Sequence, residues 1–261
     1  MRRRRPPWLA LGAGAVAALF FLLPLAGLLW RAPWSDLASD LSSPEARTAL
    51  RLSLETSLLA TGLAIVFGIP LAWVLARVDF PGRRVLRALT VLPMVLPPVV
   101  GGVALLFAFG RRGLVGQYLD RWFGITFPFT TKGAVLAATF VAMPFLVITA
   151  EAAFRSFDER FEDAARTLGA GRWTVFRRVT LPLCGPALAA GAVLCWARAL
   201  GEFGATITFA GNFPGTTQTM PLAVYLALET RPGLAITLSL VLLAVSLAVL
   251  VGLRDRWTGV S

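Results

Sequence analysis

The sequence predicts an all-α protein: a polytopic membrane protein with six transmembrane helices. Of its 261 residues, 57% are hydrophobic and only 15% are charged, and the mean hydropathy is +0.73. Soluble proteins carry about 25% charged residues. The order of the apolar residues is equally informative, because they form six long segments. Each is near the ~20 residues that a helix needs to cross a ~30 Å hydrocarbon core.

The predicted spans follow one another with mostly short connections. They cover residues 8–30, 52–76, 88–109, 133–150, 183–210 and 233–253. No segment has the composition of a separate soluble domain, so residues 1–261 are expected to form a single transmembrane domain. Another apolar segment, Met220–Glu229, is too short to span. Glycine and proline bracket it, which indicates an interfacial or partly re-entrant helix near the outer mouth.

Four arginines, Arg2–Arg5, precede the first span and raise the question of a signal peptide. The apolar run that follows them is longer than the 7–15 residues typical of such a peptide. The segment Trp30–Trp34 is also a poor cleavage site, because it lacks the A-x-A-like arrangement of small residues. The first span is therefore expected to be an uncleaved anchor.

Basic residues indicate the orientation of the chain. If Arg2–Arg5 are cytoplasmic, sixteen basic residues fall in inside segments and eight in outside segments, and Arg198 lies within a span. The positive-inside rule then predicts six spans in the cell (inner) membrane, with both termini in the cytoplasm. The net charge of +11 is explained by this topology, since the arginines punctuate apolar segments. No nucleic-acid partner is expected.

The third span contains Pro97 and Pro98. Together they remove two backbone donors, so the span is expected to kink or to be interrupted there. Such a break can line a translocation pathway, or it can be a simple bend.

The fifth span contains polar residues at membrane depth. Arg198 and Glu202 stand four residues apart on one helical face, and charges inside a membrane usually pair or face a water-filled cavity. They either form an internal pair that fixes helix packing, or Arg198 contributes positive potential to an anion pathway. Thr206, Thr208 and Asn212, near the outer end, offer uncharged donors to such a pathway or satisfy backbone groups.

The segment 151–182 is the longest charged stretch and is predicted to be cytoplasmic. Ser156 to Glu159 match a capping box, so a helix is expected to begin near Phe157. Gly169 and Gly171 can end it in left-handed geometry. A second helix should follow, with Trp173 and Phe176 on one face.

Several kinds of chemistry are excluded by missing residues. The chain has no histidine, which excludes the H-E-x-x-H zinc motif and the Ser-His-Asp triad. Its only lysine, Lys132, does not stand in a Walker A context. Cys184 and Cys195 have the spacing of neither a C-x-x-C motif nor a metal cage, and are expected to be small buried residues. We therefore expect no catalytic site, no cofactor and no metal in this chain.

A motif in the charged segment carries a family resemblance. Residues 163–169 read D-A-A-R-T-L-G, and nine residues later 179–182 read V-T-L-P. This resembles the E-A-A-x(3)-G-x(9)-I-x-L-P signature of the membrane subunits of bacterial ABC importers, with Asp163 for Glu and Val179 for Ile. The resemblance implies the type I ABC importer permease fold, in which this segment is a coupling helix that docks in a cleft of a separate ATPase subunit.

The resemblance implies a set of ATPase-docking residues. Small residues at this site would allow close approach of the backbones, and flanking charges would fix orientation at the rim. The expected docking residues are Glu162, Asp163, Ala164, Ala165, Arg166, Gly169 and Arg172. The alternative is a solvated juxtamembrane helix whose alanines only favour helicity.

Further motifs resemble one branch of these permeases. The runs A-L-G-E-F-G-A-T at 199–206, F-A-G-N at 209–212 and T-M-P-L-A at 219–223 look like molybdate permeases, whereas sulfate permeases are similar mainly at Gly201-Glu202. The implied function is import of molybdate, or of the near-isosteric tungstate, with sulfate or thiosulfate import as the alternative. The expected pathway residues are Pro97, Pro98, Arg198, Glu202, Thr206 and Asn212.

The resemblance also implies an assembly. Its parts are a second copy of the chain, two ABC ATPase subunits that bind ATP and Mg²⁺, an external oxyanion-binding protein and the surrounding membrane lipid. ATP hydrolysis would belong to the partner subunit. A protein of another class, an ATP-independent secondary carrier or channel, would need none of these partners. An intramembrane enzyme would need a carboxylate or serine site, and no paired site is present in the sequence.

Overall fold

The computed structural model describes residues 8–257, with the last turns of the final helix described by their backbone. Arg2–Arg5, on which the expected orientation depends, lie outside the described residues, as do the side chains of Arg254 and Arg256. Over the described part the chain forms helices and no strand. In chain order they are α1 (Trp8–Trp30), α2 (Leu37–Ser42), α3 (Pro44–Arg77), α4 (Arg83–Val95), α5 (Pro98–Phe109), α6 (Gly116–Phe123), α7 (Thr131–Ser156), α8 (Arg160–Thr167), α9 (Arg172–Val175), the π-helical turn η1 (Phe176–Thr180), α10 (Leu181–Leu200), α11 (Gly204–Phe209), α12 (Met220–Thr230) and α13 (Pro232–Trp257).

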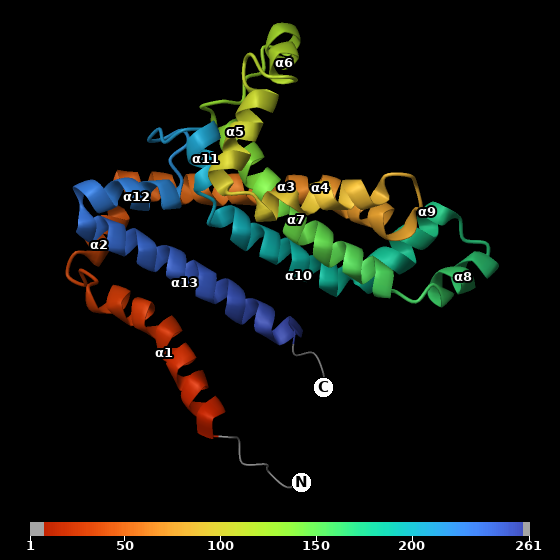
Figure 1. Ribbon diagram of the computed structural model, residues 1–261, viewed down its shortest axis with the longest axis horizontal. Helices are drawn as coiled ribbons and strands as arrows, with labels where there is room; N and C mark the ends of the chain where they lie inside the picture. The colour runs from red at the N-terminus through yellow and green to blue at the C-terminus, as the bar shows by residue number, and fades with distance from the viewer. Residues whose placement is uncertain (1–7, 258–261) are drawn as a thin grey trace.

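The core is formed where α3, α7 and α10 pack side by side (Figure 1). Small side chains dominate their contacts, including Ala60, Ala64 and Ala142, all fully buried. A Cβ atom at Gly191 of α10 would come within 3.0 Å of Thr149 Cβ on α7. Small residues let helix backbones approach closely, which is the main source of packing energy between helices in a membrane. α7 is therefore the central helix, and 67% of its apolar segment is buried within the chain.

α1 lies apart from this core. It comes near α13 only at its end beside α2 and diverges from the other helices toward its first residues (Figure 1), and none of its residues is buried. Its side chains are nevertheless strongly apolar, with hydropathy 2.3 over the span. The chain itself therefore leaves this apolar surface uncovered.

Five helices of the described part are long and apolar enough to cross a membrane. Four of them, α1, α3, α7 and α13, coincide with predicted spans, and α3 and α7 extend well beyond the predicted ends. α3 begins early because Ser43 caps it, accepting a hydrogen bond from the Ala46 N–H at 3.3 Å, and because Pro44 suits the first helical position. With 34 residues, α3 is about 51 Å long, which exceeds the hydrocarbon core.

The third predicted span, 88–109, is divided into two helices. α4 ends at Val95 and α5 begins at Pro98. Leu96 and Pro97 are extended, with ψ angles of 137° and 131°, because a residue that precedes a proline is disfavoured from helical geometry. The expected interruption at the two prolines is confirmed.

The fifth predicted span, 183–210, is also divided. α10 ends at Leu200, a turn follows, and α11 covers Gly204–Phe209. Glu202 stabilises the break, since its Oε1 accepts a hydrogen bond from the Ala205 N–H at 2.8 Å at the start of α11. The sequence pattern did not predict the break because its residues, apart from Glu202, are apolar or glycine.

The short helix expected over Met220–Glu229 is present as α12. It packs against α13 and α3, and the Met220 N–H donates to Ser53 Oγ on α3 at 2.6 Å. With 11 residues it is too short to cross a membrane.

Candidate functional site

The charged segment after α7 folds into α8, a glycine turn and α9. Gly169 has a φ of +84°, so the left-handed helix end expected there is confirmed. Gly171 is different: its φ of −68° is ordinary, and it is the N-cap of α9. From Arg172 the helix continues without interruption through η1 and α10 to Leu200. α8 is therefore joined to a membrane-spanning helix by a single glycine turn.

The start of α8 differs from the sequence prediction. Ser156 is the last residue of α7, and its Oγ donates to the Ala153 carbonyl at 3.2 Å. α8 begins at Arg160, whose N–H donates to Asp158 Oδ1 at 3.0 Å. The capping-box prediction of a start near Phe157 is wrong because Ser156, the first residue of the box, is still part of α7, and Asp158 accepts the hydrogen bond at the start of α8 instead.

Glu162 points into the chain rather than away from it. Its side chain is only 12% exposed. Oε1 accepts a hydrogen bond from Thr180 Oγ1 at 2.7 Å, and Oε2 accepts one from Arg166 Nη2 at 3.0 Å. Thr180 belongs to η1, which leads into α10. Among the residues expected to dock, Glu162 is thus the one that links α8 to the start of a membrane helix.

Arg77, the last residue of α3, connects that helix to the same place. Its guanidinium pairs with Glu159, lies 3.7 Å from Glu162 Oε1 and stands 5.7 Å from the centre of the Phe157 ring. The side chain is 13% exposed. Among the described residues its Nε and Nη2 have no hydrogen-bond partner, so α8 is tied to α3 by the pair with Glu159, the nearby charge of Glu162 and the Phe157 ring.

The outer surface of α8 and its glycine turn carries the other expected docking residues. Asp163, Ala164, Arg166, Gly169 and Arg172 are exposed, and Ala165 is half-buried. The structure thus places these residues together on one small, protruding unit at the end of α7 (Figure 1).

Large apolar side chains stand on the same unit, and sequence reasoning missed two of them. Leu168 is 89% exposed, Trp173 is 70% exposed and Phe161 is 56% exposed. Trp173 stacks on Phe176, with ring centroids 5.7 Å apart, so their expected common face is confirmed. In the sequence, Leu168 and Phe161 could have been recognised as contact residues because each stands as a large apolar residue in an otherwise polar segment. Exposed apolar clusters of this kind mark protein contacts.

A second group of candidate residues lies where the two helix breaks meet. α5 and α11 are side by side (Figure 1). A Cβ atom at Gly102 of α5 would lie 2.6 Å from Thr208 Cβ, and one at Gly204 would lie 2.7 Å from Pro98 Cβ. Only glycine permits such an approach. The structure therefore brings the proline break next to the turn that contains Glu202.

Arg198 and Glu202 form the internal pair that was one of the two expected arrangements. Arg198 Nη2 lies 2.7 Å from Glu202 Oε2, and their side chains are 28% and 2% exposed. Removing one partner of a buried pair leaves an uncompensated charge and typically costs about 3–5 kcal/mol. A contribution of Arg198 to an anion pathway stays a prediction.

The other pathway candidates have different environments. Pro97 and Pro98 are exposed on the single chain, whereas Thr206 is fully buried within α11. Asn212 is half-buried, and its Oδ1 has no hydrogen-bond partner among the described residues. Thr208 Oγ1 donates to the Gly204 carbonyl at 2.9 Å, so this hydroxyl satisfies a backbone group.

The two cysteines are free and buried, as expected. Within residues 8–257 no group of three or more Cys, Asp or Glu side chains has the arrangement of a metal site. The described part of the chain thus offers charged links and close helix contacts, and no metal cluster.

Comparison with known proteins identifies the family. Residues 57–260 match the family described as the binding-protein-dependent transport system inner membrane component. The molybdenum transport system permease protein ModB of Mycobacterium tuberculosis is 47% identical over 251 residues, which are 96% of this chain and 94% of the relative. The sulfate transport system permease protein CysT of Escherichia coli is 37% identical over 247 residues, covering 93% of this chain and 89% of that protein.

A solved structure has the same fold. It is the crystal structure of a bacterial alginate ABC transporter in complex with an alginate pentasaccharide-bound periplasmic protein. The matching chain superposes with a TM-score of 0.73, covering 96% of this chain and 94% of that one. At 20% sequence identity, this likeness concerns the fold alone.

Proposed function

Because this chain belongs to the family of binding-protein-dependent inner-membrane transport components, we propose that it is the membrane-spanning permease of an ATP-driven importer of molybdate or tungstate. The observation that carries the proposal is the exposed unit of α8 and Gly169. It is joined through one turn to a helix that runs from Arg172 to Leu200. A partner subunit that binds α8 can therefore move a membrane helix directly.

The choice of substrate follows the relatives. The similarity to a molybdenum permease is greater, at 47% identity, than that to a sulfate permease, at 37%. Both substrates are tetrahedral oxyanions, so sulfate or thiosulfate import is the second candidate. Tungstate and molybdate are nearly isosteric, and one pathway would serve both.

The energy would come from a separate ATPase subunit that binds ATP and Mg²⁺, since this chain contains no Walker A lysine. Its cleft would receive the exposed face of α8. Asp163, Arg166 and Arg172 would form rim contacts, and Ala164, Ala165 and Gly169 would allow close approach. Leu168 would supply the apolar anchor that an interface core requires.

Glu162 would act from inside the chain. Its contacts with Thr180 and Arg77 bind α8 to the ends of α10 and α3, so a displacement of α8 would be passed to both helices. Rigid links between packed elements are the usual means by which a local movement becomes a larger one.

The remaining partners are a second copy of the chain and an external oxyanion-binding protein. The uncovered apolar surface of α1 supports contact with lipid and a neighbouring subunit. Two copies would enclose a central pathway, with both termini of each in the cytoplasm. ATP binding would bring the two α8 units together and open the pathway outward, and hydrolysis would reset it.

The pathway would pass the region where α5 meets α11. Pro97, Pro98, Arg198, Glu202, Thr206 and Asn212 are the candidates, with Arg198 providing positive potential and Glu202 preventing tight trapping of the anion. A permease supplied by a high-affinity binding protein needs a weak site, because the anion must be released.

Reconstitution tests the proposal. Proteoliposomes that contain this chain, its ATPase subunit and a molybdate-binding protein are expected to take up labelled molybdate only when ATP is present. With a sulfate-binding protein, sulfate uptake should be far slower. Molybdate uptake by this chain alone, without ATP, would establish the secondary carrier or channel instead.

A further inference from the structure

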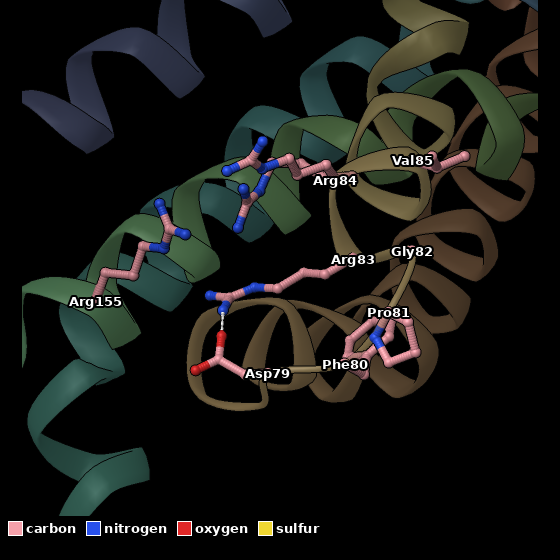
Figure 2. A pocket seen from close by; sticks show the side chains of 9 residues that line it. Asp79, Phe80, Pro81, Gly82, Arg83, Arg84, Val85 and Arg155 are labelled. Atoms are coloured by element: carbon pink, nitrogen blue, oxygen red, sulfur yellow. Dashed lines mark hydrogen bonds and ion pairs between the residues drawn. The ribbon is translucent and has the colours of Figure 1, made fainter.

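An open pocket lies between the turn that joins α3 to α4 and the last turns of α7. Its volume is about 840 Å³, and it is lined by Asp79, Phe80, Pro81, Gly82, Arg83, Arg84, Val85, Arg87 and Arg155. Figure 2 shows Arg155, from α7, extending toward the arginines at the start of α4. Four guanidinium groups from two helices thus surround one space.

Two of these arginines, Arg83 and Arg87, also bind backbone carbonyls at the end of α3. Arg83 Nε and Nη2 donate to the carbonyls of Leu75 and Ala76 at 2.8 and 3.1 Å, and Arg87 Nη2 donates to the Leu75 carbonyl at 3.2 Å. They satisfy carbonyl groups at the end of α3 that the helix itself leaves without partners. Their charge still contributes to the potential in the pocket.

The acidic side chains nearby are too few to neutralise the arginines. Asp79 pairs with Arg83. Glu151 is shared, since its Oε1 lies 2.5 Å from Arg87 Nη2 and 3.3 Å from Arg155 Nε. Arg84 has no ion-pair partner among the described residues. Four positive charges therefore face two negative charges, which leaves an excess suited to a dianion.

The N-terminus of α4 is an independent reason to expect an anion in this pocket. Its N-terminus, at Arg83, borders the pocket, with Gly82 as N-cap, no side-chain cap and no acidic residue in the first turn. A helix N-terminus carries partial positive charge, so anions are favourable there and cations are not. Of the three arginines in the first five residues of α4, Arg83 and Arg87 are offset by Asp79 and Glu151, whereas the positive charge of Arg84 at this helix end is favourable only with an anion beside it.

We propose that this pocket binds a phosphate group, with Arg84 and Arg155 as its direct ligands. Both side chains are accessible, Arg155 being 49% exposed, and guanidinium groups match phosphate oxygens in geometry. The group would come either from the headgroup of an acidic phospholipid or from free phosphate. The pocket is larger than a single phosphate ion, and its wall includes Phe80, Pro81 and the exposed Val85. This apolar part suits the remainder of a lipid headgroup.

The test uses the permease assembled with its ATPase subunit in phosphate-free buffer. One sample is placed in nanodiscs of phosphatidylcholine alone and another in nanodiscs that also contain phosphatidylglycerol. Native mass spectrometry measures the acidic lipid that stays bound after release from the disc. Calorimetric titration of the phosphatidylcholine sample with inorganic phosphate measures binding of the free ion.

The variant Arg84→Gln/Arg155→Gln is expected to lose at least tenfold in whichever binding is observed, because two charge-assisted contacts disappear. The single variant Arg84→Gln, which breaks no ion pair, should lose part of this binding. A loss in this variant excludes misfolding as the cause. The control Arg111→Gln/Arg112→Gln removes the same charge at the far end of α5 and should leave binding unchanged.

Retention of phosphatidylglycerol assigns the group to a lipid, and heat from inorganic phosphate assigns it to the free ion. Either result supports the site if the double variant abolishes it. Absence of both, or binding that is the same in the variant and the wild type, overturns it. These measurements involve no transport, so their outcome is independent of the proposed substrate.

Discussion

At the residue scale, Gly169 is the position where backbone geometry and docking are most directly connected. Its φ of +84° is unfavourable for any residue with a side chain, while a Cβ atom there would touch nothing within 4 Å in this chain. Gly169→Leu is therefore expected to cost about 1 kcal/mol of backbone strain. It should also obstruct the ATPase cleft, lowering ATP-driven uptake at least tenfold while membrane insertion is preserved.

Two control variants separate these effects. Asn tolerates left-handed geometry, so Gly169→Asn should retain much more uptake than Gly169→Leu. Gly171→Leu adds the same side chain two residues away, at an ordinary φ and in open space, and should be mild. Full coupling of uptake to ATP hydrolysis in Gly169→Leu would contradict the assignment of α8 as the docking element.

Glu162 and Asp163 are adjacent acidic residues with opposite roles. Glu162 is held by Thr180 inside the chain, whereas Asp163 pairs with Arg166 on the surface. Loss of a buried bond to a charged group typically costs about 1.5–3 kcal/mol, and loss of an exposed pair costs under 1 kcal/mol. Glu162→Gln should therefore lower thermal stability clearly, and Asp163→Asn should not.

A double-mutant cycle checks this assignment. If the Thr180 hydroxyl and the Glu162 carboxylate act as one link, the effects of Thr180→Val and Glu162→Gln on thermal stability will be less than additive. Additive effects would show that the two side chains contribute independently and that α8 is tied to α10 by other contacts.

At the element scale, the contact between α5 and α11 depends on glycine at two positions. A Cβ atom at Gly102 would lie 2.6 Å from Thr208 Cβ and 2.9 Å from the Ala205 carbonyl oxygen. Gly102→Ala should thus force the two helices apart, at a typical cost of about 1–3 kcal/mol for overpacking. Thermal unfolding of the purified protein measures this cost.

Gly62→Ala is the matched control, because a Cβ atom at Gly62 in α3 meets nothing within 4 Å. Alanine is favoured over glycine in a helix interior by roughly 0.5–1 kcal/mol, so this variant should be neutral or slightly stabilising. Equal stability of the two variants would mean that α5 and α11 can separate without cost.

The elements also show which features the sequence could predict. Long apolar runs predicted α1, α3, α7 and α13, because hydropathy depends on composition alone. Two adjacent prolines predicted the break between α4 and α5. The break after Leu200 was not predictable, because it depends on the docking of Gly204 against Pro98, a contact between residues far apart in the chain. The burial of Glu162 depends in the same way on Thr180 and Arg77.

At the scale of the whole molecule, the arrangement of helices predicts which loops face each side of the membrane. The turn at Gly82, the unit around α8 and the N-terminal residues are expected in the cytoplasm, and Arg112 and Lys132 outside. If Gly82 lies in the cytoplasm and Arg112 outside, the chain must cross the membrane once between them. Only α4 and α5, 13 and 12 residues long, lie there, so they must cross the membrane together. Each alone is shorter than the ~20 residues of a complete span.

Cysteine labelling in intact cells tests this arrangement. Both native cysteines are buried, so a membrane-impermeant maleimide should react mainly with introduced cysteines. Arg112→Cys is expected to be labelled from outside, and Asp79→Cys, in the turn between α3 and α4 where the side chain is 96% exposed, only after the membrane is opened. If both are labelled from the same side, α4 and α5 do not cross the membrane together. The α8 unit and the arginine pocket would then lose their common cytoplasmic location, which docking of an ATPase requires.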